Sequence, residues 1–328
     1  MPMSAITIEK YSSYIQNALQ NCITETNFDI GTKYKGKVRD NYDLSDKLLL
    51  VSTDRQSAFD RLLASVPFKG QVLNLISSWW FEKTKHIISN HLIDVPDPNI
   101  TIAKKCSVFP VEFVVRSYLT GSTNTSIWTH YKNGLRNFSG VQLRPDLKKN
   151  HKLDELILTP TTKDKHDKPI SKTEIVKSKL MTKKDFEIAY NAALKLFKFG
   201  SNIAARNGLI LVDTKYEFGK DENGNILLVD EIHTPDSSRY WLADTYEDRI
   251  ANNMEPENID KEFLRLWFVD NCDPYLDENL PKAPDELIMQ LSFNYIKLYE
   301  MITNEKFYFP IQVSDIKKRM LENITSWL

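Results

Sequence analysis

The segment from Leu209 to Glu231, LILVDTKYEFGKDENGNILLVDE, carries charged side chains within two runs that otherwise have the composition of sheet core. Successive side chains of a strand point to opposite faces. The charges of the first run therefore share one face, and the other face is fit to be core. Alternation predicts two sets: Leu209, Leu211, Asp213, Lys215 and Glu217 on one face, and Ile210, Val212, Thr214, Tyr216 and Phe218 on the other.

The Asn-Gly pair at 223–224 lies between the two runs and is a strong signal for a two-residue type I′ hairpin turn. That turn sets Glu217 directly opposite Asp230. Two opposed carboxylates repel each other, and a divalent cation between them reverses the effect. Oxygen-only ligands favour Mg²⁺. We therefore predict a magnesium site at this pair, with Lys215 beside it for an anionic substrate. The alternative is an exposed sheet face with ordinary charges.

Three further segments offer donors for phosphate groups. A solvated surface is the simpler interpretation of any one of them, because short basic clusters are common on protein surfaces. Together with a magnesium site they indicate a nucleoside triphosphate and a second phosphorylated ligand. The donors are Ser237, Ser238 and Arg239 in TPDSSRYW, Arg116 and Ser122 in VVRSYLTGS, and Lys35, Lys37 and Arg39 in YKGKVRD.

Composition excludes several classes of function. Lys and Arg number 43 against 44 Asp and Glu, so the net charge is −1 and no nucleic-acid partner is predicted. The three cysteines are widely spaced, which argues against a disulfide framework and a structural zinc site. Neither a secretory signal nor an apolar run of about 18 residues is present. We therefore expect a cytoplasmic protein without a membrane span. The P-loop and dinucleotide-binding motifs are absent.

The elements that must position these residues follow from hydrophobic periodicity and turn signals. Strands come early and helices late, which favours the α+β class. We expect a helix over 7–20, strands on both sides of Gly36, a helix over 71–88, two strands within 99–122, a long loop region with short elements over 139–181, a helix after the capping sequence Thr182-x-x-Asp185, and helices from about 255 onward.

Taken together, the motifs resemble the SAICAR synthetase family, the phosphoribosylaminoimidazole-succinocarboxamide synthases. They occur in the family's order between residues 36 and 241. Their length and wording are similar to the longer, yeast-like branch, and too few residues follow the last motif for a second catalytic domain, so we expect a monofunctional protein. The motifs are GKVRDNYDL, LLVSTDRQSAFD, FPVEFVVRSYLTGS, LTPTTKDKHDKPIS, LILVDTKYEFG and LLVDEIHTPDSSRYW.

The resemblance implies an ATP-dependent ligase of purine biosynthesis that joins carboxyaminoimidazole ribonucleotide (CAIR) to L-aspartate, through an acyl phosphate. It also implies a two-lobed α+β fold, related to ATP-grasp and kinase-like architectures, with ATP between the lobes. We expect the N-terminal lobe over residues 1–108. The second lobe is expected over 109–328, with its substrate and magnesium sites followed by helices.

The resemblance also assigns roles to individual residues. ATP would meet Lys37, Arg39 and Lys163, and the adenine would meet the 103–108 segment that includes Lys104 and Val108. Glu217 and Asp230 would hold Mg²⁺ and, with Lys215, carry the catalysis. CAIR would meet Arg116, Ser122, Asp213, Lys215 and Arg239, with Ser238 and Asp54 also in the substrate region.

Two other functions stay open from the sequence. The first is another ATP-dependent carboxylate–amine ligase, or a small-molecule kinase, of the same fold. The second is a nucleotide-binding protein that has lost catalysis; it would be expected to lack a carboxylate or the lysine of the hairpin, and none is missing. The L-aspartate site, a general base and the oligomeric state are not predicted.

Overall fold

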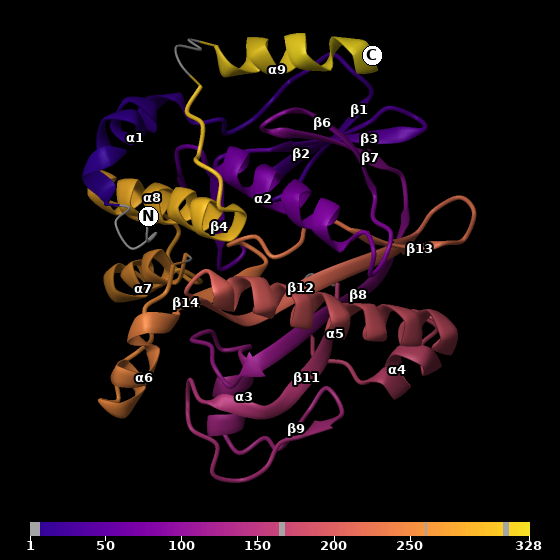
Figure 1. Ribbon diagram of the computed structural model, residues 1–328, viewed down its shortest axis with the longest axis vertical. Helices are drawn as coiled ribbons and strands as arrows, with labels where there is room; N and C mark the ends of the chain where they lie inside the picture. The colour runs from indigo at the N-terminus through magenta and orange to yellow at the C-terminus, as the bar shows by residue number, and fades with distance from the viewer. Residues whose placement is uncertain (1–6, 164–167, 260, 311–314) are drawn as a thin grey trace. The chain divides into compact units, whose positions relative to one another are not determined.

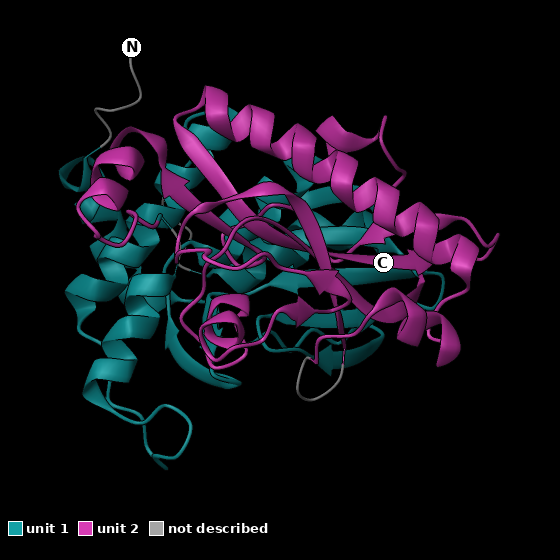
Figure 2. Ribbon diagram, turned by 90° about the horizontal axis from the view of Figure 1, so that it is seen from below, with its two compact units in different colours: residues 1–80, 92–105, 259–328 teal, residues 81–91, 106–258 magenta. Residues whose placement is uncertain are grey.

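The computed structural model describes residues 7–163, 168–259, 261–310 and 315–328. The chain divides into two compact units, coloured separately in Figure 2. Unit 1 comprises residues 1–80, 92–105 and 259–328, and unit 2 comprises residues 81–91 and 106–258. Each unit contains a five-stranded sheet together with helices, which confirms the α+β class. In the described part of the chain, no helix is long and apolar enough to cross a membrane.

Unit 1 is built on an antiparallel sheet with the strand order β1-β2-β3-β7-β6 (Figure 1). A separate hairpin of β4 and β5 follows β3 in the chain. The strands are β1 (Thr32–Lys35), β2 (Arg39–Asp43), β3 (Lys47–Ser52), β4 (Arg55–Ala58), β5 (Arg61–Ser65), β6 (Leu92–Asp97) and β7 (Ile100–Lys104). The helices are α1 (Ser12–Ala18), α2 (Lys69–Thr84), whose last turn belongs to unit 2, α7 (Glu262–Asn271), α8 (Asp285–Thr303) and α9 (Ile316–Ile324).

Helices cover both faces of the unit 1 sheet because its central strands are apolar on both sides. Met320 and Ile324 of α9 pack on the face that includes Leu49 and Val51 of β3. Ile100 of β7 belongs to the same cluster. The following residue, Thr101, points to the other face of the sheet, where its hydroxyl donates to Asn74 Oδ1 of α2 at 2.7 Å.

The C-terminal helices belong to unit 1, which differs from the predicted lobe boundary. The predicted second lobe ran from residue 109 to the C-terminus, whereas residues 259–328 group with the N-terminal sheet. Long-range contacts explain the grouping. Tyr295 of α8 donates to Gln56 Oε1 at 3.0 Å, and Arg319 of α9 forms a two-pronged ion pair with Asp97 at 2.8 and 2.9 Å.

Unit 2 is built on a second sheet with the order β11-β8-β12-β13, in which β14 also pairs with β12. Its neighbouring strands are all antiparallel. The strands are β8 (Ser107–Tyr118), β9 (Asn137–Phe138), β10 (Val141–Gln142), β11 (Lys152–Thr162), β12 (Leu209–Lys220), β13 (Ile226–Val229) and β14 (Ser238–Leu242). The helices are α3 (Ile127–Lys132), α4 (Lys172–Lys177), α5 (Lys183–Arg206) and α6 (Ala243–Ala251).

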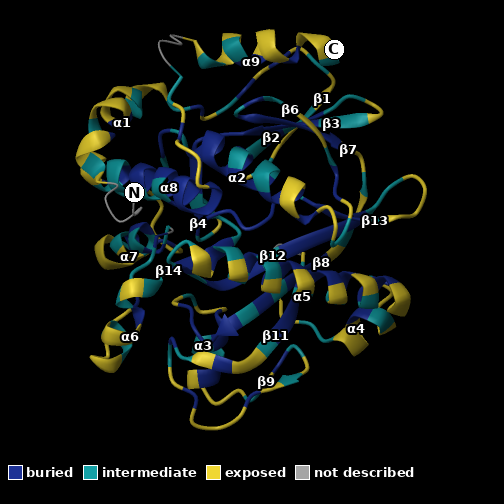
Figure 3. Cartoon of the chain, viewed as in Figure 1, coloured by how far each residue is buried: buried dark blue, intermediate teal, exposed yellow. Residues whose placement is uncertain are grey.

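Helix α5 covers one face of this sheet. It begins where the sequence predicted, because the Thr182 hydroxyl caps it by accepting from the backbone N–H of Asp185 at 3.1 Å. Its apolar side packs on the sheet, with the Phe186 ring 5.4 Å from that of Phe113 in β8. Its other side is exposed (Figure 3). The opposite face of the sheet is therefore left for the polar side chains.

Strand β11 is the main element that the sequence prediction missed, since residues 139–181 were expected to be a loop region with short elements. The strand pairs with β8 over Ile157–Thr162. Its polar residues and Pro160 hide the usual apolar alternation. Thr159 and Thr161 alternate with Leu158 and Pro160, and the two threonines lie on the polar face of the sheet, where they bond to Arg116 and Glu112.

Candidate active site

Asp213 lies between two arginines on the polar face of the unit 2 sheet. It is directly opposite Arg116 of β8 and Arg239 of β14. Its Oδ2 accepts from Arg116 Nη1 at 2.9 Å and from Arg239 Nη1 at 3.0 Å. Burial lowers the pKa of Arg116, and the Asp213 carboxylate opposes that effect. Two guanidinium groups share one carboxylate, so the cluster keeps a positive charge that suits a phosphate or carboxylate ligand.

Lys215 continues the polar face two residues further along β12. Its Nζ lies 2.8 Å from Glu112 Oε1 and 3.0 Å from Glu217 Oε1. Glu112 of β8 is directly opposite Glu217 in the register. Burial disfavours the Lys215 charge, but the carboxylates of Glu217, Asp230 and Glu112 raise its pKa well above the usual value. Lys215 is therefore a fixed cation at neutral pH.

Glu217 is the most deeply placed carboxylate of the site, with 3% of its surface exposed. Burial raises its pKa, and the negative charge of Asp230 adds to that effect. Lys215 and Lys163 act in the opposite direction, and Lys163 forms an ion pair with the second Glu217 oxygen. Lys163 is the last described residue of its motif, because residues 164–167 lie outside the described part of the chain.

The predicted hairpin register is wrong by one residue. Glu217 pairs with Val229, not with Asp230, which follows the end of β13. The loop is not a two-residue turn. Asp221 accepts the backbone N–H groups of Asn223 and Asn225 at 3.0 and 2.8 Å, and its own N–H donates to Asn225 O at 3.0 Å.

The result is a three-residue loop over 222–224. Gly224 adopts a positive φ of 79° at its last position, as is usual when a type I turn ends in a left-handed residue. The Asp221 carboxylate accepts backbone N–H groups within the loop and so stabilises a different turn from the one that an Asn-Gly pair alone predicts.

Asp230 nevertheless lies within electrostatic reach of the site, because its charge affects the pKa of both Glu217 and Lys215. Its backbone has a φ of 69°, a left-handed conformation that is uncommon for a non-glycine residue. The strand ends at Val229, and the left-handed residue turns the chain. Asp230 therefore affects Glu217, as predicted, because the chain turns at Asp230 after β13 and not because the two residues pair across the hairpin.

The predicted face assignment is correct from Asp213 to Phe218 and wrong for the start of the strand. The register with β14 shifts by one residue between Leu211 and Asp213, which marks a bulge. Val212 packs with Trp241 of β14, whereas Leu211 lines a cavity with Phe197 of α5. The bulge interrupts the alternation, so Leu209 and Leu211 do not share the face of Asp213.

The carboxylates of Glu217 and Asp230 fit a magnesium ion chemically, because Mg²⁺ takes one or two carboxylates and fills its other positions with water and phosphate oxygens. No group of three or more His, Cys, Asp or Glu side chains is arranged for a metal among the residues that the structure describes. An all-protein cage of the calcium or zinc type is therefore not formed by this part of the chain.

The segment after β13 carries several predicted residues and is anchored by His233. The Tyr216 hydroxyl lies 2.5 Å from His233 Nε2, and Tyr240 donates to the backbone oxygen of His233 at 2.9 Å. Burial lowers the pKa of His233 to about 3, so the imidazole is neutral at physiological pH. This anchor fixes the chain between Asp230 and Arg239.

Two predicted substrate residues lie apart from the Asp213 cluster. Ser238 is buried, and its hydroxyl lies 2.7 Å from that of Thr214. Thr214 follows Asp213 in an extended strand, so Ser238 points to the face opposite the cluster. Ser122 is exposed in the turn between β8 and α3.

In unit 1, the predicted phosphate-binding turn joins β1 to β2, and the Arg55 side chain donates hydrogen bonds to its backbone. The guanidinium group donates to the backbone oxygens of Gly36 and Lys37 at 3.0 and 3.1 Å and to Asp40 Oδ1 at 2.9 Å. Arg55 is 3% exposed. The Lys37 ammonium is exposed and pairs with Asp60 at 2.5 Å.

Arg39 begins β2 directly after this turn and pairs in register with Ser52 of β3. Its side chain is half-buried. Of the two predicted phosphate contacts, Lys37 therefore lies in the turn that Arg55 supports, and Arg39 directly follows it.

Asp54 has both carboxylate oxygens occupied by backbone donors. They accept from Ile23 N at 2.7 Å and from Gly70 N at 2.9 Å, and the residue is 3% exposed. Burial raises the pKa of Asp54 to about 6. Its predicted contact with substrate remains a prediction, and this geometry favours a role in joining three chain segments.

The predicted adenine segment, residues 103–108, contains the point where the chain passes from unit 1 to unit 2, between Lys105 and Cys106. Lys104 is the exposed last residue of β7. Val108 is the second residue of β8 and is 43% exposed, although it is apolar. Its accessible apolar side chain is compatible with the predicted contact to a base.

The structure adds polar site residues that the sequence analysis did not single out. Glu112 and Thr159 bond directly to Lys215 and Arg116, respectively. Glu112 could have been found from the sequence. It lies four residues before Arg116 in the same strand, and an even spacing places both side chains on one face. No local signal identified Thr159, because its strand was not predicted.

Comparison with known proteins identifies the relatives of this chain. Residues 32–282 match the SAICAR synthetase family. The phosphoribosylaminoimidazole-succinocarboxamide synthase of Legionella pneumophila strain Paris is 60% identical over 308 residues, covering 94% of this chain and 99% of that protein. The chloroplastic synthase of Arabidopsis thaliana is 58% identical over 298 residues, covering 89% of this chain and 72% of that protein.

Solved structures agree with this relationship. The SAICAR synthase of Saccharomyces cerevisiae, complexed with SAICAR, aligns with a TM-score of 0.74 and 32% identity over 87% of this chain and 99% of that one. A SAICAR synthetase in complex with ADP aligns with a TM-score of 0.65 and 28% identity over 85% of this chain and 100% of that one. By its sequence and its fold, this chain belongs to the SAICAR synthetase family.

Proposed function

We infer that the chain carries out the reaction of its family, the ATP-dependent ligation of L-aspartate to CAIR in purine biosynthesis. The products are SAICAR, ADP and phosphate. The observation that carries this inference is the polar face on which Asp213 lies between Arg116 and Arg239 and Lys215 follows two residues later. It combines an anion-binding cluster with a fixed cation and a buried carboxylate.

CAIR contains a phosphate and a carboxylate, and the polar face has separate cations for two anionic groups. We assign Arg116 and Arg239 to one anion and Lys215 to the other. Asp213 orients both guanidinium groups. The yeast relative was solved in complex with SAICAR, which supports a ligand of this class. Ser122 and Ser238 remain predicted contacts.

ATP is assigned to the Gly36–Arg39 turn, the 103–108 segment and Lys163. A relative solved with ADP supports nucleotide use. Arg55 holds the turn rigid from within unit 1. Glu217 and Asp230 would hold Mg²⁺, which when bound would neutralise charge on the triphosphate.

The proposed reaction has two steps. The CAIR carboxylate attacks the γ-phosphorus of ATP, which forms an acyl phosphate and releases ADP. The amine of L-aspartate then attacks the acyl carbon, phosphate leaves, and the amine proton passes to solvent or phosphate. Lys215 lies where it can hold the reacting carboxylate, and its raised pKa keeps it charged throughout. Positioning and electrostatic stabilisation supply most of the rate acceleration in such transfers.

An assay of ADP release tests this function. The purified protein is mixed with Mg·ATP and all combinations of CAIR and L-aspartate. We expect ADP only when CAIR and L-aspartate are both present, together with the new amide product by mass spectrometry. Equal ADP release with another acceptor amine would favour a different ligase of the same fold. Release with CAIR alone, as a stable phosphorylated product, would favour a kinase.

The proposed partners are small molecules, namely ATP, CAIR and L-aspartate. No nucleic-acid partner is proposed, since the net charge is −1. A cytoplasmic location stays a prediction.

A further inference from the structure

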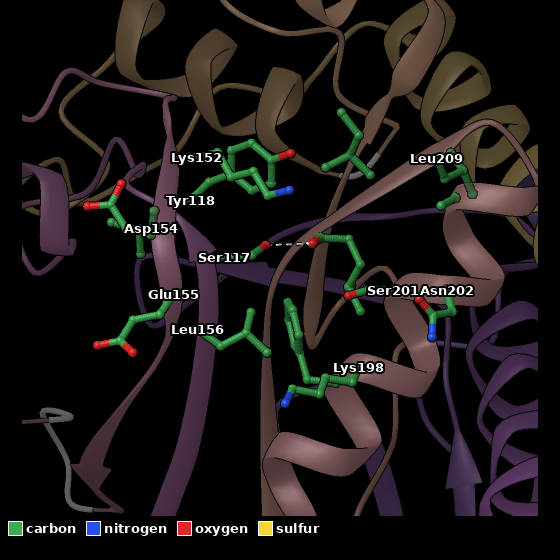
Figure 4. Close-up of a pocket in the computed structure, with 15 residues that line it drawn as sticks. Ser117, Tyr118, Lys152, Asp154, Glu155, Leu156, Lys198, Ser201, Asn202 and Leu209 are labelled. Carbon is green, nitrogen blue, oxygen red and sulfur yellow. Dashed lines mark hydrogen bonds between the residues drawn. The ribbon is translucent and has the colours of Figure 1, made fainter.

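Unit 2 contains a cavity of about 540 Å³ whose lining includes none of the residues assigned above to ATP, CAIR or Mg²⁺. It lies where β11 and β12 flank the end of β8 and α5 passes beside them (Figure 4). Its volume falls in the range of about 300–1,000 Å³ that is typical of small-molecule sites. The lining comes from Ser117 and Tyr118 of β8, residues 152–156 of β11, residues 209–211 of β12, and one side of α5.

The cavity exists because the sheet is irregular at this point. Lys152 pairs with Tyr118, but the next pair along β11 is Ile157 with Arg116, so residues 153–156 leave the ladder. On the other side, the Ser117 hydroxyl donates to the backbone oxygens of Leu211 and Val212, both at 3.0 Å. Such bulges are more frequent next to functional sites than elsewhere in sheets.

The inner wall of the cavity is apolar, with one unsatisfied polar atom. Phe197, Leu209 and Leu211 are each at most 3% exposed and supply the wall. The hydroxyl oxygen of Ser201 is buried and has no hydrogen-bond partner among the residues that the structure describes. A buried polar atom without a partner is uncommon in folded proteins. A ligand with a polar atom near Ser201 would satisfy it.

The charges at the rim favour an anion. In Figure 4 the Lys152 ammonium points toward the middle of the cavity, whereas the carboxylates of Asp154 and Glu155 point away from it. Asp154 is bonded to Arg144 Nε at 2.7 Å instead. Lys198 of α5 also lines the cavity. In the described part of the chain, neither lysine has an ion-pair partner.

We propose that this cavity is a second ligand site, which binds a small organic monoanion with an aromatic or aliphatic body. The body packs on Phe197, Leu209 and Leu211, and the anionic group lies at Lys152. The Asp213 cluster is not part of the lining, so the site is separate from the proposed CAIR site and binds its ligand without competing with CAIR or ATP.

The probe for this site is 8-anilinonaphthalene-1-sulfonate, which has an aromatic body and one negative charge and becomes fluorescent in apolar surroundings. Ala205 is exposed but lines the cavity, so Ala205→Phe fills it with little strain on the fold. Ala251→Phe, at an exposed alanine at the end of α6, is the matched control. Lys152→Gln removes the charge at the rim, with Lys195→Gln on the exposed side of α5 as its control.

We expect saturable one-to-one binding to the wild type and to both controls. Binding should weaken about tenfold in Ala205→Phe, which corresponds to about 1.4 kcal/mol of binding free energy. In Lys152→Gln it should weaken severalfold. Saturating ADP, CAIR and L-aspartate should leave the titration unchanged. Far-UV circular dichroism verifies the fold of each variant, and Asn202→Trp, at another exposed lining residue, replaces Ala205→Phe if that protein does not fold.

Equal affinity of the Ala205→Phe and Ala251→Phe proteins, or a titration that does not saturate, would overturn the site. Loss of the signal on adding ADP, CAIR or L-aspartate would place the probe in the reaction site and would also overturn it. Unchanged affinity in Lys152→Gln would overturn the anionic class of ligand. None of these results depends on whether the chain ligates CAIR, so the test is distinct from that of the proposed function.

Discussion

Glu112 and Glu217 lie directly opposite each other on β8 and β12, and the ammonium group of Lys215 bridges them at 2.8 and 3.0 Å. Opposed like charges destabilise a sheet when nothing lies between them. Here the bridging cation offsets the repulsion. The arrangement also holds Lys215 in one direction, because its Nζ is fixed from both sides. Glu112 is therefore a positioning residue for Lys215.

Replacing Glu112 by Gln should lower kcat/KM for CAIR by at least about tenfold, since each 1.36 kcal/mol of lost transition-state stabilisation is tenfold in rate. Because a carboxylate that raises the Lys215 pKa is lost, the alkaline limb of the pH–rate profile should also shift to lower pH. Glu247→Gln, at an exposed residue of α6, is the control. An unchanged alkaline limb would contradict the positioning role, even if the rate falls.

The proposed metal pair predicts a different phenotype. Glu217→Gln and Asp230→Asn should each abolish Mg·ATP turnover while far-UV circular dichroism stays that of the wild type. Binding of Mn²⁺ in the presence of ADP, followed by electron paramagnetic resonance, should be lost as well, because each variant removes one anionic oxygen ligand. Glu112→Gln serves as the comparison and should keep Mn²⁺ binding. Wild-type metal binding in either single variant would remove that residue from the metal site.

Local sequence signals predicted the parts of the site that depend on one strand. Alternation was sufficient to place Asp213 and Glu217 on one face, and the side-chain cap at Thr182 was sufficient to start α5. Residue patterns indicated only the α+β class, Mg²⁺, a nucleoside triphosphate and a second phosphorylated ligand. Resemblance to a family contributed the two-lobed fold and the identities of CAIR and L-aspartate. The strand alternation and the helix cap were predicted for the same reason, because each rests on the geometry of a few consecutive residues.

The failures depend on contacts that are distant in the sequence or on competing side chains. The register at Asp230 failed because the Asp221 carboxylate reshapes the turn. Strand β11 was missed because its polar residues face the site, so they do not resemble a strand of the core. For Asp54, the assignment to the substrate region remains a prediction, and only the fold shows that its oxygens accept from the backbone of Ile23 and Gly70.

Arg55 is predicted to be required for the turn that carries Lys37. It is buried and donates to Thr24 O at 2.5 Å in addition to the turn and Asp40. Arg55→Ala leaves Asp40 Oδ1 without its donor, while Oδ2 keeps its bonds to Thr26 and its ion pair with Lys33. We therefore expect the free energy of unfolding to fall by roughly 3 kcal/mol, the lower end of the range for breaking a buried ion pair. Urea unfolding measures this. Arg55→Lys keeps the charge but not the fork of donors, so it should restore only part of the stability.

A double-mutant cycle with Asp40→Asn supplies the control for Arg55. The two substitutions should be clearly non-additive, because the residues are in direct contact at 2.9 Å. Arg144→Lys, at an exposed ion pair, should change stability little. Additive effects of Arg55→Ala and Asp40→Asn would mean that the ion pair does not hold the turn.

His233 should make stability dependent on pH in a defined window. Its pKa is about 3 in the folded protein, against 6.5 for the unperturbed group. Below pH 6.5 the unfolded chain therefore binds a proton that the folded protein does not, and stability is lost as the pH falls toward 3. Relative to His233→Gln, which cannot titrate, the wild type should lose about 2 kcal/mol between pH 7 and pH 5. Urea unfolding at both pH values measures the difference, and a constant difference would show that His233 titrates normally.

Gly200 of α5 lies directly against the His233 ring, which reverses the usual effect of a helical Gly→Ala substitution. In a helix interior, alanine normally stabilises by about 0.5–1 kcal/mol relative to glycine. A Cβ at Gly200 would lie 2.2 Å from His233 Cε1 and 2.6 Å from Nδ1, closer than any real contact. Gly200→Ala should therefore destabilise by about 1–3 kcal/mol, the typical cost of overpacking. It should also lower kcat, because displacing His233 moves the segment between Asp230 and Arg239. In a His233→Ala background the clash is absent, so the same substitution should become neutral or stabilising. A Gly200→Ala protein as stable and active as the wild type would mean that the ring can move without cost and does not anchor the segment.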